Sequence, residues 1–340
     1  MALMEKKENN SLSFNSLELN KEKSCAGKTN PLVAILMCTF NGSRFLSEQL
    51  NSIEDQDFSN WVVIVSDDGS TDATFEVLQE YQSKWPKGKL RIRTGPRKGF
   101  SINFQSLICD AHIVADYYSY CDQDDVWLPD KLSTAVKAIS DLSLHEDGPS
   151  CLPVLYCGRS TYVSNSLESL GESQLFLYPK TFSNALVQNI AGGNTMVMNH
   201  HAKLLFEKVG IQDVYFHDWW SYLLISGANG GIIYDAIPKI LYRQHEFAQV
   251  GEIRSIRYRL SRFLTIINGD LKNWNGKNLI ALRLANQFIC IENKEKIKLF
   301  EKMRSSRLIG RLRLLRICGI YRQTRRGEIA LILAILIGKI

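Results

Sequence analysis

The chain of 340 residues lacks the features of several common protein classes. Its eight cysteines form no Cys-x-x-Cys pair, and Cys38, Cys109 and Cys290 stand in apolar runs, which favours buried reduced thiols over a disulfide scaffold or a zinc site. Residues 1–30 are polar, contain no apolar stretch fit for a signal peptide and are predicted to be a disordered tail. The cysteine pattern predicts a cytoplasmic protein. No internal repeat is present, and 340 residues with a hydrophobic content of 45% suffice for one large α/β domain and an appendage.

Three predicted strands each end in a polar turn. Residues 61–65 form a continuous apolar, β-branched run typical of a strand buried in a parallel sheet, and residues 32–37 and 116–120 are predicted to be two further strands. The turns that follow cover residues 38–42, 66–72 and 121–127. Because open α/β sheets bind ligands at the carboxyl ends of their strands, we expect the three turns to form one site.

The third turn concentrates negative charge. Asp122, Asp124 and Asp125 place three carboxylates within four positions, a costly arrangement unless a cation is present. Alternate side chains of an extended segment point the same way, so Asp122 and Asp124 can converge on one ion while Gln123 faces elsewhere. Hard cations such as Mg²⁺ or Mn²⁺ take such oxygen ligands. The alternative is a solvated acidic turn that caps the helix predicted from residue 131 onward.

The second turn offers a different chemistry. Asp67 or Asp68 can accept a hydrogen bond from a nucleobase N–H or a ribose hydroxyl, and Gly69 permits the chain to turn. Residues 70–72 supply side-chain oxygens that cap the next helix. The alternative is that all these acids serve only as caps.

Taken in order, residues 38–42, 65–70 and 122–127 resemble the motifs of the family-two glycosyltransferases. The resemblance implies a GT-A fold, an α/β nucleotide-sugar-binding fold with a mixed, mainly parallel central sheet flanked by helices. We expect this domain to cover residues 31–250 and a basic helical C-terminal extension to cover residues 251–340.

The resemblance also implies roles for individual residues. The acid that contacts the nucleobase in that family maps to Asp68, and the acids that contact the ribose and the metal map to Asp122 and Asp124, with Asp124 the preferred ligand of Mg²⁺ or Mn²⁺. The other donor-binding residues implied are Thr39, Asn41, Asp67, Gly99 and Asn103. The last two lie in residues 97–104, which resemble the family's segment between the base and diphosphate sites; the alternative is an ordinary strand-to-helix loop.

The acceptor side is expected downstream. Residues 191–195 are rich in glycine, which lets backbone approach a ligand closely, and they precede an apolar strand at residues 196–198. Asp218 resembles the general base of these transferases, since a carboxylate within hydrogen-bond reach of an acceptor hydroxyl can take its proton. Trp219 and Trp220 could present apolar faces to an acceptor sugar, although adjacent tryptophans on a helix are more often split between core and surface.

Residues 241–245 resemble a segment of bacterial rhamnosyltransferase-like members of the family. Arg243 or His245 could meet the leaving diphosphate, and the His245 imidazole could ligate the metal; the alternative for a lone histidine near a strand end is structural hydrogen bonding. The chain departs from that pattern at Cys121, where Ser is usual, and at residues 246–248, where a Gly-Asn-Asn-like turn often follows.

The resemblance therefore implies a metal-dependent, inverting transferase of surface polysaccharide or O-antigen biosynthesis. The best match is transfer of L-rhamnose from dTDP-rhamnose to a glycan or lipid-linked saccharide. A UDP-hexose or UDP-GlcNAc donor is an alternative. Thymine differs from uracil by one methyl group, and an apolar pocket gains only about 1–3 kcal/mol of discrimination from it. A catalytically idle nucleotide-sugar-binding or membrane scaffold protein is another. A sugar nucleotidyltransferase is disfavoured, since residues 38–42 supply no Gly-rich phosphate loop.

Positive charge gathers near the C-terminus, where residues 304–326 carry eight arginines and no acid. Apolar residues between Leu308 and Ile317 interleave with them at amphipathic-helix spacing, and the apolar residues 329–337 are too few to span a bilayer. This predicts peripheral attachment to the anionic inner face of the cytoplasmic membrane. The alternative is a solvated arginine face on a helix packed against the catalytic domain. Nucleic-acid binding is disfavoured, because Tyr321 is the only interleaved aromatic residue.

Overall fold

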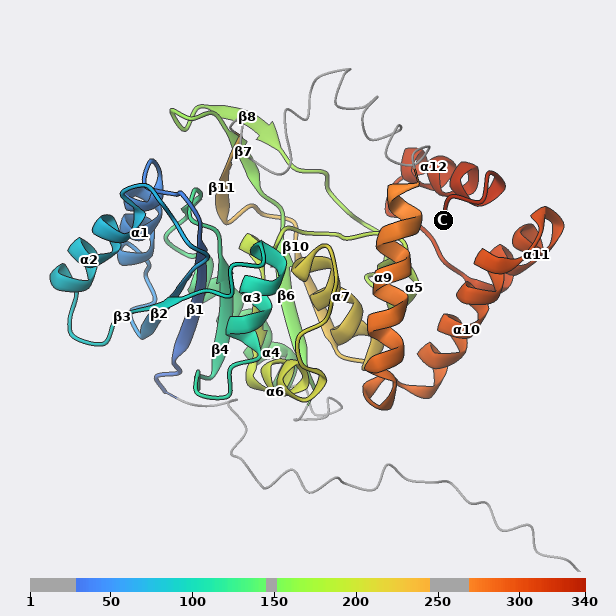
Figure 1. The fold of residues 1–340 in the computed structure, drawn as a ribbon, viewed down its shortest axis with the longest axis horizontal. Helices are drawn as coiled ribbons and strands as arrows, with labels where there is room; N and C mark the ends of the chain where they lie inside the picture. The colour runs from blue at the N-terminus through green and yellow to red at the C-terminus, as the bar shows by residue number, and fades with distance from the viewer. Residues whose placement is uncertain (1–28, 145–151, 245–268) are drawn as a thin grey trace, which may run out of the picture.

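The computed structural model describes residues 29–144, 152–244 and 269–340. A seven-stranded sheet in the order β10-β6-β9-β4-β1-β2-β3 runs through the molecule between helices (Figure 1). Its strands are β1 (Val33–Thr39), β2 (Trp61–Asp67), β3 (Leu90–Thr94), β4 (Tyr117–Cys121), β6 (Val154–Gly158), β9 (Val197–Asn199) and β10 (Gly231–Asp235). Neighbours are parallel except where β9 pairs with β4 and β6. The predicted α/β class with a mixed, mainly parallel sheet is confirmed.

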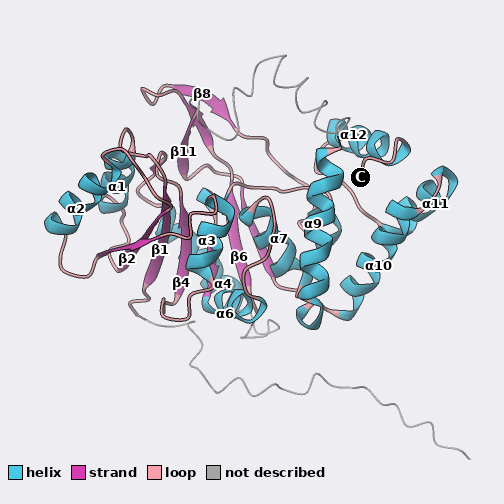
Figure 2. Cartoon of the chain, in the orientation of Figure 1, coloured by secondary structure: helices cyan, strands magenta, loops and turns pink. Residues whose placement is uncertain are grey.

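Helices bury both faces of the sheet (Figure 2). Their bounds are α1 (Leu46–Glu54), α2 (Thr74–Lys84), α3 (Phe100–Ile108), α4 (Lys131–Leu144), α5 (Phe182–Ala185), α6 (His200–Val209) and α7 (His217–Gly227). Because side chains alternate along a strand, Leu36 and Ile64 pack with α3, α6 and α7, whereas Ile35 and Val63 pack with α1, α2 and α4. Burial on both faces explains why β1 and β2 are apolar without a break.

A smaller sheet stands beside the acidic turn. It contains β5 (Val126–Trp127), β11 (Ile240–Arg243), β7 (Thr161–Val163) and β8 (Ser169–Glu172), in the order β5-β11-β7-β8. β5 begins directly after the acidic residues and pairs antiparallel with β11. The turn is therefore fixed at both ends, by β4 of the large sheet and by β5 of the small one.

The C-terminal region is helical, as predicted. Its helices are α9 (Asp270–Leu284), α10 (Ile291–Ser305), α11 (Leu308–Cys318) and α12 (Arg325–Leu336). They share the core on the α7 side of the sheet, and the Asn293 amide of α10 donates to the carbonyls of Ser226 and Gly227 at 3.1 and 3.2 Å. The basic stretch is not one helix, since a left-handed Gly319 ends α11 before α12 begins. The expected domain boundary at residue 250 lies outside the described residues.

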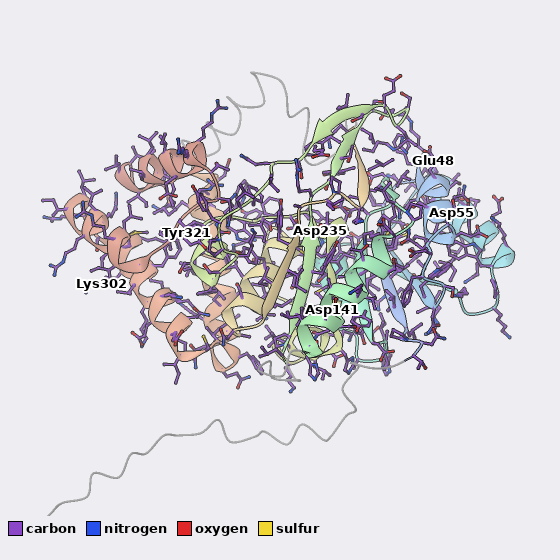
Figure 3. All side chains as sticks on the ribbon, turned by 180° about the vertical axis from the view of Figure 1, so that it is seen from behind. Glu48, Asp55, Asp141, Asp235, Lys302 and Tyr321 are labelled. Carbon is purple, nitrogen blue, oxygen red and sulfur yellow. The ribbon has the colours of Figure 1, made fainter. Side chains whose placement is uncertain are left out.

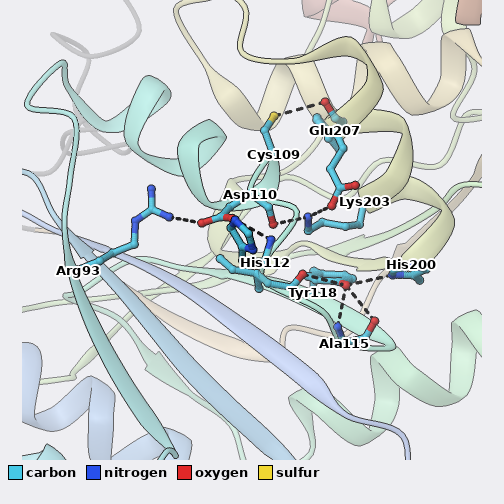
Figure 4. Close-up of polar contacts among 11 residues, drawn as sticks. Arg93, Cys109, Asp110, His112, Ala115, Tyr118, His200, Lys203 and Glu207 are labelled. Carbon is cyan, nitrogen blue, oxygen red and sulfur yellow. Dashed lines mark hydrogen bonds and ion pairs between the residues drawn. The ribbon is translucent and has the colours of Figure 1, made fainter.

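A polar network joins α6 to the segment after α3 and to β3 and β4 (Figure 4). The Asp110 carboxylate accepts from Arg93 at 2.7 Å, and its backbone carbonyl accepts from Lys203 at 2.8 Å. The Tyr118 hydroxyl lies 3.0 Å from a ring nitrogen of His200 at the start of α6. These contacts tie α6 to β3 and β4 and are structural.

Candidate active site

Asp67 uses its carboxylate to hold the turn after β2. It accepts from the Thr39 hydroxyl at 2.8 Å, from the Ser70 hydroxyl and N–H at 2.6 and 2.8 Å, and from the Gly69 N–H at 3.1 Å. Burial acts to raise the pKa of Asp67, but the bonds from Ser70, Thr39 and Gly69 outweigh it and leave the pKa below its ordinary value. A carboxylate accepts about four hydrogen bonds, so the predicted donor contacts of Asp67 and Thr39 gain no support from this arrangement.

Asn41 joins the turns after β1 and β2. It lies in the left-handed region at φ 50°, where asparagine is tolerated. Its N–H donates to the Ser70 hydroxyl at 2.9 Å, and its side-chain oxygen accepts from the Thr71 N–H at 2.8 Å. The structure thus places Asn41 at the predicted edge, with its side-chain oxygen bonded within the protein.

Gln123 joins the acidic turn to the turn after β1. Its amide accepts from the Phe40 N–H at 2.8 Å and donates to the Phe40 carbonyl at 3.0 Å. A Cβ on Gly42 would lie 2.1 Å from the Gln123 side-chain oxygen, so glycine is required for this pairing. As the alternation predicted, Gln123 is turned toward β1 and is not part of the acid cluster.

Asp68 holds the loop between β3 and α3. Its two carboxylate oxygens accept from the backbone N–H groups of Arg97 at 2.6 Å and Gly99 at 2.8 Å. Gly99 has φ 84°, which favours glycine, and it precedes α3. The buried Asn103 of α3 donates to the Ser66 carbonyl at 2.8 Å. The structure therefore brings the second turn and the segment after β3 together, as predicted.

Two acids of the third turn and one acid of α7 lie close enough to interact electrostatically. The pKa of Asp122 is raised to about 8. Burial is the main cause, and the nearby charges of Asp124 and Asp218 add to it. Burial also raises the pKa of Asp218 to about 6, against hydrogen bonds from the Trp219 N–H, the Asn189 side chain and the Gly193 N–H. The Trp219 N–H lies 2.6 Å from the carboxylate. Asp122 therefore senses the charges of both Asp124 and Asp218, which places the three carboxylates in one site.

Asp125, the third carboxylate of the acidic turn, is fully buried. It accepts hydrogen bonds from the Asn194 side-chain amide and, at 3.4 Å, from the Arg243 backbone N–H. The apolar Val126 and Trp127 that follow it start β5. The sequence contained one signal for this role: neighbouring side chains of an extended segment point to opposite sides, so Asp125 would face away from Asp124.

Arg243 does not point to solvent. Its buried guanidinium donates to the Asp124 carbonyl at 3.0 Å, to Glu48 Oε2 at 2.7 Å and to the Asn165 carbonyl, and it lies 4.3 Å from the centre of the Phe45 ring. The predicted contact of Arg243 with the donor diphosphate gains no support from this arrangement, because the guanidinium is buried and bonded within the protein. No sequence pattern indicated Glu48 as a partner of Arg243, because the two residues are 195 positions apart.

Comparison with known proteins identifies the family. The model of Glycosyl transferase family 2 matches residues 34–146. Over 245 residues, 68% of this chain and 79% of the relative, the sequence is 30% identical to the dTDP-rhamnosyl transferase RfbG of Shigella flexneri. The chain belongs to the family-two glycosyltransferases. It is also 30% identical over 122 residues, 36% of this chain and 38% of the relative, to the GalNAc(5)-diNAcBac-PP-undecaprenol beta-1,3-glucosyltransferase of Campylobacter jejuni.

Solved structures resemble the glycosyltransferase more weakly. The mannosyltransferase PcManGT from Pyrobaculum calidifontis, in complex with GDP-Man and Mn²⁺, is 17% identical, with a TM-score of 0.48 over 94% of this chain and 89% of that one. The description of the site therefore depends on the chain's own residues.

Family-two glycosyltransferases are expected to bind a divalent cation, and Asp122 and Asp124 are suitable ligands for it. Among the described residues, no group of three or more His, Cys, Asp or Glu side chains is arranged to hold a metal ion. Asp122 and Asp124 repel one another, and a bound cation would relieve that repulsion. Mg²⁺ is often held by one or two carboxylates plus substrate phosphates, so two protein ligands suffice. His245, the third predicted ligand, lies outside the described residues.

The two tryptophans of α7 belong to the core of the glycosyltransferase. Trp219 donates from its indole to the Ala185 carbonyl at 2.7 Å, and Trp220 is fully buried. Both are packed with the side chains on the α7 side of the sheet. The predicted contact with an acceptor sugar gains no support for either residue, because both rings are buried.

Proposed function

We propose that this glycosyltransferase moves L-rhamnose from dTDP-rhamnose to a saccharide or lipid-linked saccharide during assembly of a bacterial surface polysaccharide such as O-antigen. The strongest support for sugar transfer at this site is the electrostatic coupling of Asp122 with Asp124 and Asp218. The choice of rhamnose is supported by the identity of 30% to a dTDP-rhamnosyl transferase. A UDP-hexose or UDP-GlcNAc donor is the competing assignment.

The proposed chemistry is a single inverting displacement. Asp218 takes the proton of an acceptor hydroxyl, whose oxygen forms a bond to the anomeric carbon of the donor as the bond to the diphosphate breaks. A β-linked donor sugar would give an α-linkage. Holding both sugars on one site removes the entropic cost of bringing them together during reaction. Asp218 suits this role because burial brings its pKa to about 6, close enough to neutrality for a base that is ionised yet reactive.

The diphosphate end is assigned to the acidic turn. Asp124, with Asp122 beside it, would hold Mg²⁺ or Mn²⁺, which when bound stabilises negative charge on the leaving diphosphate. Asp68 and the loop that it holds are assigned to the nucleoside. The Asp68 oxygens already accept from Arg97 and Gly99, so a base contact would be made by sharing these oxygens or by moving that loop.

The first test measures thermal stability with dTDP-rhamnose, UDP-glucose and UDP-GlcNAc, each with and without Mn²⁺. A ligand that binds only the native state stabilises it by about 2.7 kcal/mol at 100 times its Kd. We expect selective, Mn²⁺-dependent stabilisation by dTDP-rhamnose that is lost in Asp124→Asn. Asp141→Asn, an exposed carboxylate on α4, is the matched control and should respond as the wild type does (Figure 3).

Each other outcome changes the proposal in a defined way. Stabilisation by a UDP-sugar alone would keep sugar transfer and discard rhamnose. Stabilisation without turnover in the presence of acceptors would favour the idle binding protein. No response to any nucleotide sugar would refute the assignment of the site.

We also assign the acceptor end of the reaction to a membrane surface. Among the described residues, no helix is long and apolar enough to cross a bilayer. Ile329 and Leu333 of α12 and its C-cap residue Ile337 are exposed at helical spacing, and Ile329 lies one turn after the exposed Arg325. An apolar stripe beside cationic side chains is the pattern of helices that lie in the surface of an anionic bilayer. This would keep the enzyme close to lipid-linked saccharides.

A further inference from the structure

A set of four polar side chains, three of them buried, joins the acidic turn to the segment that holds Asp218. We call it the clasp and define it as Glu48, Asp125, Asn194 and Arg243. Arg243 and Asp125 have no exposed area, and Asn194 is almost fully buried. These residues come from α1, the acidic turn, the segment before β9, and β11.

One half of the clasp acts on Asp124. The Arg243 Nε donates to the Asp124 backbone carbonyl at 3.0 Å, while Nη2 meets Glu48 at 2.7 Å and Nη1 meets the Asn165 carbonyl. The rigid, planar guanidinium makes all three contacts at once and packs against the Phe45 ring. Fixing the Asp124 carbonyl fixes the backbone from which its carboxylate extends.

The other half leads toward Asp218. The Arg243 backbone N–H and the Asn194 side-chain amide donate to different oxygens of Asp125. Asn194 follows Gly193, whose N–H donates to the Asp218 carboxylate. An unbroken set of hydrogen bonds and two peptide units therefore connects the turn of Asp124 with the carboxylate of Asp218.

We propose that Arg243 and Asp125 are positioning residues that set where the Asp124 carboxylate stands relative to Asp218. Their contact with the reaction is indirect, since both are buried behind the turn. The distance between leaving diphosphate and attacking hydroxyl depends on these two carboxylates, and errors of about 1 Å in such geometry cost about 100-fold in rate. The inference depends on the proposed function only for its kinetic test.

The decisive test exchanges the two ends of the Asp125–Asn194 bond. Asn194→Asp sets two carboxylates against each other, and we expect kcat to fall about 10- to 100-fold, as when partners of metal ligands are lost, with a smaller change in donor KM. Adding Asp125→Asn restores one amide and one carboxylate and should recover most of the loss. Asp125→Asn alone should be mild, because the Asn194 amide can turn to present its oxygen.

A second readout needs neither metal nor sugar. Amide hydrogen exchange at residues 122–125 and 193–195 should quicken in Asn194→Asp and in Arg243→Lys, which keeps the charge but cannot make three directed contacts. Exchange in α10 should stay unchanged. Glu54→Gln, on the same helix as Glu48, is the matched control, because Glu54 lies outside the clasp and its ion pair with Lys84 at 2.7 Å is exposed to solvent.

The outcomes separate this inference from the proposed function. If the wild type transfers no sugar while exchange responds as described, the function is wrong and the clasp stands. The exchanged pair has the same net charge as the wild type. If it is nevertheless as slow as Asn194→Asp, the loss comes from the carboxylate at position 194 and not from the broken bond, and the positioning role is refuted. Wild-type exchange at residues 122–125 in folded Arg243→Lys would refute it as well.

Discussion

At the scale of single residues, the same side chain serves different purposes according to what surrounds it. Asp67 and Asp218 are both aspartates near the edge of the sheet. Asp67 receives four hydrogen bonds and its pKa falls, whereas burial dominates at Asp218 and raises its pKa to about 6. The motif pattern could place acids at this edge, but it could not assign these roles, because Thr39 and Asn189 act across long sequence separations.

The environment of Asp218 predicts a pH dependence. A general base must be ionised, so kcat should fall as the pH drops through about 6, where the carboxylate gains a proton. Asp218→Asn should lose about 100- to 10,000-fold in kcat and also lose this acidic limb. The measurement is a kcat profile from pH 4.5 to 8 at saturating donor. An unaltered limb in Asp218→Asn would assign the titration to another group.

Gly42 supports a second prediction about a single residue. A methyl group there would lie 2.1 Å from the Gln123 side-chain oxygen and push it away, which breaks both bonds to Phe40. Since each such bond contributes about 0.5–1.5 kcal/mol, Gly42→Ala should lower the free energy of unfolding by about 1–3 kcal/mol in a urea titration. Gly276→Ala in α9, whose nearest neighbour is 3.7 Å away, should not destabilise. In a Gln123→Ala background the Gly42→Ala penalty should largely vanish, and a penalty that persists would contradict this explanation.

At the scale of elements, the local pattern of apolar residues predicted individual strands but not the pairing of distant strands. The strands predicted at residues 32–37 and 61–65 are β1 (Val33–Thr39) and β2 (Trp61–Asp67). The sequence did not show that β11 continues through Arg243 and pairs with β5 and β7. β11 lies far from β5 and from β7 in the sequence, and the periodicity of apolar residues within one segment does not indicate which distant segment it pairs with.

The packing of α7 predicts how stability depends on pH. His217 lies on the Phe104 ring, with centroids 4.1 Å apart, and burial lowers its pKa to about 3. The unfolded chain binds a proton there near pH 6.5, whereas the folded chain does not until about pH 3, so this histidine makes the protein less stable as the pH falls between those values. Urea unfolding at pH 7 and pH 5 should show a smaller loss in His217→Phe than in the wild type.

Other titrating groups are common to both proteins in that comparison, so the difference isolates the imidazole. Asp122, whose folded pKa is raised, acts in the opposite direction and is unchanged by the substitution. Equal losses for wild type and His217→Phe would mean that His217 accepts a proton in the folded protein.

At the scale of the whole molecule, two functions are assigned to separate surfaces. Glu48, on the side of the acidic turn, and Lys302, on the helical extension, lie at opposite sides of the molecule (Figure 3). Tyr321 links the extension to the centre, where its carbonyl accepts from Asn184 at 2.9 Å. The extension is thus held firmly by the catalytic part while α12 still exposes an apolar stripe.

This arrangement predicts binding to anionic membranes through α12. The full chain should float with vesicles of phosphatidylglycerol and phosphatidylcholine and should not float with phosphatidylcholine alone. Raising the salt to 1 M shortens the screening length from about 10 Å to 3 Å and should weaken the binding. The double substitution Ile329→Asp and Leu333→Asp should abolish flotation while leaving transfer to a water-soluble acceptor unchanged.

The matched control distinguishes a basic apolar surface from exposed apolar area in general. Ile280 and Leu284 of α9 are 56% and 69% exposed, against 59% and 40% for Ile329 and Leu333, and they have the same spacing of four residues. They lack the neighbouring pair Arg325 and Arg326, and the nearby Arg283 is paired with Glu301 at 2.6 Å. Acidic substitutions at Ile280 and Leu284 should therefore leave flotation intact. If they abolish it equally, or if the wild type never floats, α12 is not a membrane surface, and its stripe is better explained by contact with another protein chain.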